Sequence, residues 1–112
     1  MNILGEQFFT ILNMDKDFAF KLADMLEKST NELLEQLRKA VENADSKKSK
    51  DILHTIKGSA ANFGAEELME QARDIESAIY LLNKDNIKEY KECIVNLNNT
   101  LQRTLKEIEN HK

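Results

Sequence analysis

The segment His54-Thr55-Ile56-Lys57-Gly58-Ser59-Ala60-Ala61-Asn62-Phe63-Gly64 decides the fold predicted for this chain. At about 100° per residue, its apolar side chains gather on one face of a helix, because Ile56, Ala60 and Phe63 all lie roughly 140–240° from His54. The histidine is therefore predicted to face solvent from an amphipathic helix whose other face packs on a core. Gly64 tolerates left-handed backbone dihedrals and marks the end of that helix.

Small and basic residues surround the histidine on the predicted exposed face. Those within roughly 60° of it on the helical wheel are Lys47, Lys50, Lys57, Gly58 and Ala61. A neutral imidazole is a nucleophile near neutral pH, and neighbouring ammonium groups can compensate the charge of a bound anion. Glycine in mid-helix costs about 1 kcal/mol of stability relative to alanine. The place of Gly58 on the exposed face therefore indicates that another protein needs the space beside His54. The alternative is that this glycine is a tolerated defect of the helix.

Helical periodicity continues on the N-terminal side of this segment. A short apolar stretch over residues 3–12 predicts a lid helix. A long helix then begins at a cap provided by Asp15 or Asp17 and runs to about Val41. Its predicted core stripe is Phe18, Leu22, Met25, Leu26, Leu33, Leu37, Ala40 and Val41. Ser46 is the predicted cap of the histidine-bearing helix.

Two more helices follow Gly64. Glu66 and Glu67 favour the first turn of one, whose stripe is Leu68, Ala72, Ile75, Ile79 and Leu82. After a turn over residues 83–86, the last helix carries Ile87, Tyr90, Ile94, Leu97, Leu101, Leu105 and Ile108. Connections this short favour antiparallel neighbours. The sequence therefore predicts an all-α fold: an antiparallel up-down-up-down four-helix bundle with a short N-terminal lid helix, forming a single domain over residues 1–112.

Composition agrees with a bundle and excludes several functions. The 112 residues include no proline and three glycines, and the net charge of −4 argues against binding the phosphate backbone of nucleic acid. No apolar run is long enough for a bilayer span and the N-terminus lacks a signal peptide's pattern, so we expect no membrane association and a cytoplasmic protein. The single cysteine, Cys93, excludes an internal disulfide and is predicted to be an inert thiol, with a reactive one as the alternative.

The histidine segment also resembles the signature of histidine-containing phosphotransfer (HPt) domains: histidine, two residues, lysine and glycine, small residues, then an apolar residue and glycine. The resemblance extends over nearly the whole chain, because that family has a lid-like helix on a four-helix bundle of about this length. It implies a phosphorelay intermediate of two-component signal transduction. Such a protein accepts a phosphoryl group from a receiver-domain aspartyl phosphate and passes it to another response-regulator aspartate.

The resemblance also implies roles and partners. His54 would be the phosphoacceptor, Lys57 the cation that stabilises the phosphate, and Gly58 the clearance for a docking partner. Further docking candidates are Lys47, Lys50, Asp51 and Ala61. The expected partners are response-regulator receiver domains and a hybrid sensor histidine kinase. The chain itself would be a monomeric phosphocarrier with no kinase activity, ATP site, cofactor or metal, and the magnesium ion would belong to the partner receiver domain.

Other interpretations remain open from the sequence alone. A helical adaptor could bind receiver domains or other partners without phosphotransfer, although it would have no need of His54. The Asp51-x-x-His54 spacing resembles half of a di-metal ligand pair, but such sites need two Glu-x-x-His units, and the only other histidine is His111. Leu53, at a position often small in HPt domains, is predicted either to pack inward or to extend an apolar docking rim. The Met1 start favours a free-standing protein.

Overall fold

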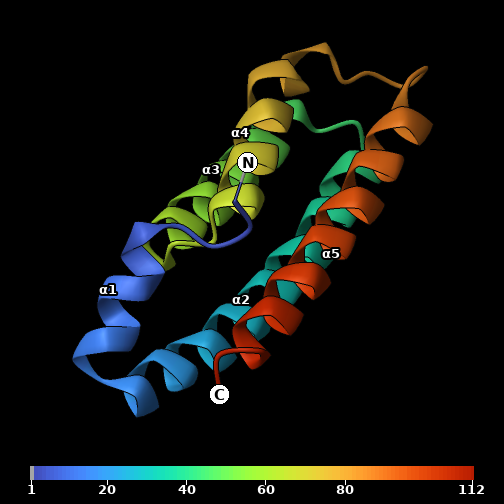
Figure 1. The fold of residues 1–112 in the computed structure, drawn as a ribbon. Helices are drawn as coiled ribbons and strands as arrows, with labels where there is room; N and C mark the ends of the chain where they lie inside the picture. Colours follow the sequence, from blue (N-terminus) through green and yellow to red (C-terminus); the bar gives the residue numbers. More distant parts are fainter. Residues whose placement is uncertain (1) are drawn as a thin grey trace.

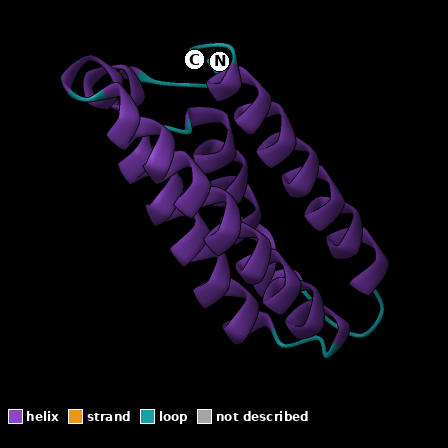
Figure 2. Ribbon diagram, turned by 90° about the horizontal axis from the view of Figure 1, so that it is seen from below, coloured by secondary structure: helices purple, strands orange, loops and turns teal. Residues whose placement is uncertain are grey.

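The computed structural model describes residues 2–112 and is helical in all its regular structure (Figures 1 and 2). The elements are α1 (Glu6–Met14), α2 (Lys16–Glu42), α3 (Ser46–Phe63), α4 (Glu66–Ala78), the short 3₁₀ helix η1 (Ile79–Leu81) and α5 (Ile87–Glu109). Helices α2 to α5 run alternately up and down, each packs on the next, and α5 closes the ring against α2 (Figure 1). The predicted antiparallel bundle with an N-terminal lid helix is confirmed.

The helix boundaries follow from local capping. Asp15 caps α2, because its side chain accepts a hydrogen bond from Phe18 N at 3.0 Å. The predicted Ser46 cap of α3 is wrong: Asp45 occupies that position and accepts from Lys48 N at 3.0 Å, while Ser46 is the first helical residue. Gly64 ends α3 as predicted, with φ at 93° in the left-handed region.

The core of the bundle is a continuous set of buried aliphatic side chains contributed by α2 to α5. Its fully buried members include Leu37, Ile56, Leu68, Leu97 and Leu101. The prediction was wrong for two members of the α2 stripe, since Phe18 is 50% exposed and Met25 59% exposed. The small residues Ala19 and Ala23 face the core of the bundle instead.

The lid helix α1 is fixed to the end of α3. Gly5 N donates to the carbonyl of Gly64 at 2.8 Å, and Phe8, fully buried, packs its ring on Phe63 with centroids 5.4 Å apart. His111, just beyond α5, adds an edge contact to the Phe8 ring at 5.7 Å. Burial of these aromatic side chains attaches a helix that would be too short to be stable alone.

Candidate functional site

The histidine of α3 faces solvent, as its place on the helical wheel predicts. The His54 side chain is 69% exposed, while Leu53 before it and Ile56 after it are fully buried. Leu53 therefore packs inward, and the alternative that it extends a docking rim is wrong. The buried neighbours hold the helix firmly on the core, so the imidazole stands on a rigid surface rather than on a loop.

A carboxylate from the next helix contacts the histidine ring. Nδ1 of His54 lies 3.1 Å from Oε2 of Glu76 on α4, whose side chain is only 12% exposed. The other carboxylate oxygen, Oε1, lies 2.7 Å from Nζ of Lys57. One nearly buried carboxylate thus joins the histidine and the lysine that the sequence had placed on one face of α3.

The charge state of Glu76 determines which ring nitrogen carries the proton. Burial by itself would raise the pKa of the Glu76 carboxyl, but the hydrogen bonds and positive charge of Lys57 and His54 outweigh it and lower that pKa below its ordinary value. The carboxylate is therefore ionised at neutral pH and can only accept hydrogen bonds. Nδ1 of His54 must donate, and a neutral ring then keeps its free lone pair on Nε2, across the ring from Glu76.

Lys57 is less exposed than the sequence suggests. Its side chain is 28% exposed and extends along the surface toward α4, where it pairs with Glu76. The ammonium group therefore shares the Glu76 carboxylate with Nδ1 of the His54 ring. Lys47, Lys50 and Asp51, the docking candidates of the preceding turns, are all exposed on α3.

Gly58 leaves bare surface beside the histidine. A Cβ atom built at this position would meet nothing within 4 Å, so no packing within residues 2–112 requires glycine there. On the wheel Gly58 lies roughly 40° from His54 and Lys57 roughly 60° on the opposite side. Because Lys57 reaches toward α4, Gly58 lies on the side of His54 that faces α2.

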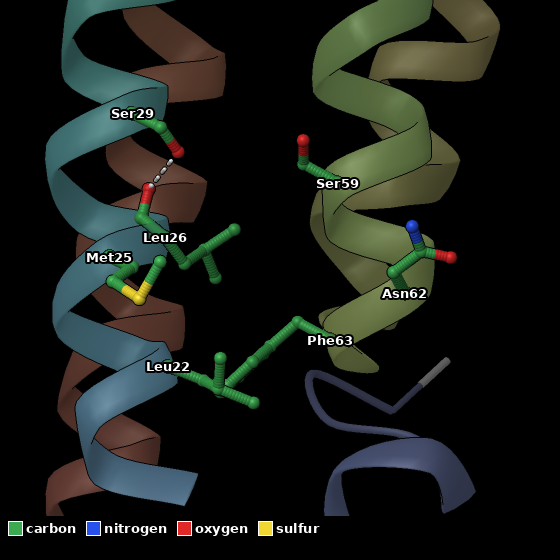
Figure 3. Close-up of a pocket in the computed structure, with 7 residues that line it drawn as sticks. All are labelled: Leu22, Met25, Leu26, Ser29, Ser59, Asn62 and Phe63. Carbon is green, nitrogen blue, oxygen red and sulfur yellow. Dashed lines mark hydrogen bonds between the residues drawn. The ribbon is translucent and has the colours of Figure 1, made fainter. Parts of the chain in front are cut away.

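An apolar groove begins on that side. It lies between α2 and the C-terminal half of α3, has a volume of about 410 Å³, and is lined by Leu22, Met25, Leu26, Ser29, Ser59, Asn62 and Phe63 (Figure 3). The Leu22, Leu26 and Phe63 side chains extend into the space between the two helices, as does the Ser59 hydroxyl. Ala61, another docking candidate, is exposed and lines a separate groove against the lid helix with Gly5 and Glu66.

Glu76 is the residue that sequence reasoning missed. The connection between α3 and α4 could have indicated it, because residues equally far from a tight antiparallel connection lie opposite each other, and His54 and Glu76 are both eleven residues from Ala65. The periodicity could not select it, however, because α4 also carries Glu66, Glu67, Glu70 and Asp74. Only the rotation of α4 about its axis decides which carboxylate reaches His54.

The structure also bears on Cys93 and on the alternative of a metal site. Cys93 is half-buried on α5, and burial together with the nearby Glu92 charge raises the pKa of its thiol, which is the environment of an unreactive cysteine. Within residues 2–112, no three or more His, Cys, Asp or Glu side chains gather as a metal site would require. No helix in the same range is long and apolar enough to cross a membrane.

One protein-family model matches nearly the whole chain. A family model described as Hpt domain matches residues 21–111, which is nearly the whole chain and includes the His54 segment and Glu76. No curated protein and no solved structure matches the chain. Hpt domains are helical bundles that carry phosphoryl groups on histidine in two-component phosphorelays, where they interact with receiver domains and kinases.

Proposed function

The chain belongs to the Hpt domain family, and from that premise we propose that it is a phosphorelay intermediate with His54 as its phosphoacceptor. The observation that carries the proposal is the hydrogen bond from Nδ1 of His54 to Glu76, since it leaves the Nε2 lone pair of an exposed ring free to attack. A surface histidine without such a partner would populate both tautomers.

In the proposed reaction, Nε2 of His54 attacks the phosphorus of a receiver-domain aspartyl phosphate. The Nε2–P bond forms, the acyl O–P bond breaks, and its electron pair leaves with the receiver's aspartate carboxylate. Transfer onward reverses these steps on the aspartate of another response regulator. Lys57 compensates the charge of the phosphoryl oxygens, because positioning and charge stabilisation supply most of the catalysis in phosphoryl transfer. The magnesium ion is contributed by the acidic pocket of the receiver domain.

The receiver domain would dock over Gly58 and extend into the groove between α2 and α3. Three features support this placement: Gly58 has open space beside the imidazole, the groove starts on the same side, and its apolar lining suits a protein surface rather than a charged ligand. The exposed rings and thioethers of Phe18 and Met25 continue the apolar surface along α2. A hybrid sensor histidine kinase, through its receiver domain, would use the same face.

Labelling tests the proposal directly. Candidate receiver domains are phosphorylated with ³²P-acetyl phosphate and mixed with the chain; we expect label on His54 that is lost in acid and stable in base, as a phosphoramidate is. His54→Gln should accept no label. His111→Gln is the matched control, because it removes the other histidine of the chain and should accept label normally. Equal labelling of wild type and His54→Gln would refute the proposal, and receiver binding without any label would favour the adaptor alternative.

A further inference from the structure

The proposed reaction uses Nε2 of His54 and leaves the role of the Nδ1 proton unassigned. That proton lies in the 3.1 Å contact between Nδ1 and Oε2 of Glu76. The carboxylate is nearly buried, at 12% exposed, and its pairing with Lys57 through Oε1 keeps it in place. A fixed, ionised acceptor beside Nδ1 can act on the ring after phosphorylation as well as before it.

The proton matters most when the phosphoryl group leaves. Once Nε2 carries phosphorus, the ring holds a proton on Nδ1 and a positive charge shared by both nitrogens. When a receiver aspartate attacks phosphorus, the Nε2–P bond breaks and its electron pair returns to Nε2. If Nδ1 has kept its proton, the ring leaves as neutral imidazole. If the proton has been lost, the ring must leave as an imidazolate anion, which is a far poorer leaving group.

Resting on the proposed function, we propose that Glu76 is a positioning residue that keeps the proton on Nδ1 of phosphorylated His54. The carboxylate accepts a charge-assisted hydrogen bond, which is roughly twice as strong as one to a neutral acceptor. Glu76 thereby extends to higher pH the range in which the phosphoryl group can be passed on. The same contact assists both steps. It leaves Nε2 free when His54 accepts the phosphoryl group, and it keeps the proton on the imidazole leaving group when the phosphoryl group is passed on.

The other charged groups around the ring are few. On α3 itself they are Lys57 and, one turn earlier, Lys50 and Asp51, both exposed. On α4, Arg73 lies one turn before Glu76 and pairs with Glu70 along its own helix. The short η1 contributes Tyr80, which is 73% exposed.

Among residues 2–112, no charged side chain of the remaining elements packed on α3 forms a hydrogen bond or ion pair with His54. Uncharged side chains line the α2 groove, and Glu6 of α1 lies beside Ala61, two turns away along α3. Glu76 is therefore the one nearly buried charge in direct contact with Nδ1.

The test compares Glu76→Gln with wild type after phosphorylation by potassium phosphoramidate. Glutamine keeps the size of the side chain and an acceptor oxygen but removes the charge. The ¹⁵N NMR shifts of the ring, followed from pH 6 to 10, give the midpoint at which phosphorylated His54 loses its Nδ1 proton. We expect this midpoint to fall by about one pH unit in Glu76→Gln, with a matching fall in the pH at which transfer to a receiver becomes slow.

Lys57→Met provides the matched control, because it breaks the ion pair while leaving the Glu76 charge. It should slow transfer at every pH and should not lower the midpoint, since removal of a cation cannot ease loss of a proton. An unchanged midpoint in Glu76→Gln, or an equal fall in Lys57→Met, would overturn this role of Glu76 but would leave the proposed function intact. If wild type takes no phosphate from phosphoramidate or from any receiver, the proposed function fails and this inference with it.

Discussion

Nζ of Lys57 lies 2.7 Å from Oε1 of Glu76, so the cation expected to meet a phosphoryl group is paired within the chain before any phosphate arrives. The pair joins α3 to α4 at the level of His54. It contributes to the stability of the bundle and also holds the carboxylate that orients the imidazole. Substitutions at these two positions should therefore change stability and chemistry to different extents.

Stability should depend on pH through Glu76. Its pKa in the folded chain lies below the ordinary value of 4.5, so the stabilisation is present above that value and is lost as the pH falls through the folded pKa. We expect the free energy of unfolding of Glu76→Gln at pH 7 to be about 0.5–1 kcal/mol lower than that of wild type. Urea unfolding at pH 7, 5, 4 and 3 should show this difference shrinking toward zero at the acid end, and a difference that is constant with pH would contradict the ionic origin.

Gly58 should be replaceable without loss of folding. A Cβ there meets nothing within 4 Å, so Gly58→Ala should stabilise the chain by about 0.5–1 kcal/mol through helix propensity. Gly58→Lys should fold equally well but slow transfer from a receiver domain at least tenfold, because its side chain would fill the space beside His54. Gln102→Lys on α5 is the control, since α5 does not pack on α3. Transfer at the wild-type rate by Gly58→Lys would contradict the proposal that Gly58 leaves space for a docking partner.

Gly64 should show the opposite response in the same urea experiment. Its φ of 93° disfavours any side chain, and a Cβ would lie 2.3 Å from the backbone nitrogen of Phe8. We expect Gly64→Ala to destabilise the chain by about 1–3 kcal/mol and to loosen the lid helix. Faster hydrogen exchange at the amides of α1 would report the loosening. Wild-type stability for this variant would mean that α1 does not depend on close contact with the end of α3.

The α2 groove gives a docking prediction with a closely matched control. Met25 on the groove and Val95 on α5 are exposed to nearly the same extent, at 59% and 58%. We expect Met25→Lys to raise the KM for a phosphorylated receiver domain about tenfold with little change in the maximal rate, because it would place a charge in an apolar contact. Val95→Lys should leave KM unchanged. Equal effects of the two variants would place the receiver elsewhere.

A buried hydroxyl offers a test of the core. Thr30 is 1% exposed and its Oγ1 has no hydrogen-bond partner among residues 2–112, whereas Oγ1 of Thr104 donates to the carbonyl of Thr100 at 2.8 Å. Thr30→Val should therefore raise the free energy of unfolding by up to about 1 kcal/mol, and Thr104→Val should lower it by a similar amount. Thermal unfolding of the two variants would measure the contrast, and a loss of stability in both would point to a partner for the Thr30 hydroxyl in solution.

The sequence by itself determined the features that depend on local geometry. The exposure of His54 opposite Ile56 follows from the helical period, and the end of α3 at Gly64 follows from the freedom of glycine in the left-handed region. The bundle itself follows from amphipathic stripes joined by short connections. One local choice could not be resolved from the pattern: Asp45 and Ser46 are both good caps, and Asp45 occupies the cap position of α3.

Tertiary structure alone decided the contacts that depend on how each helix is rotated about its own axis. That rotation is set by close packing of the whole core, to which every helix contributes. Packing on Ala19 and Ala23 left Phe18 and Met25 of α2 exposed, and Met25 lines the apolar groove beside α3. It also turned Glu76, rather than the other acidic residues of α4, toward His54 and Lys57. The histidine could be read from the sequence, but the carboxylate that orients it could not.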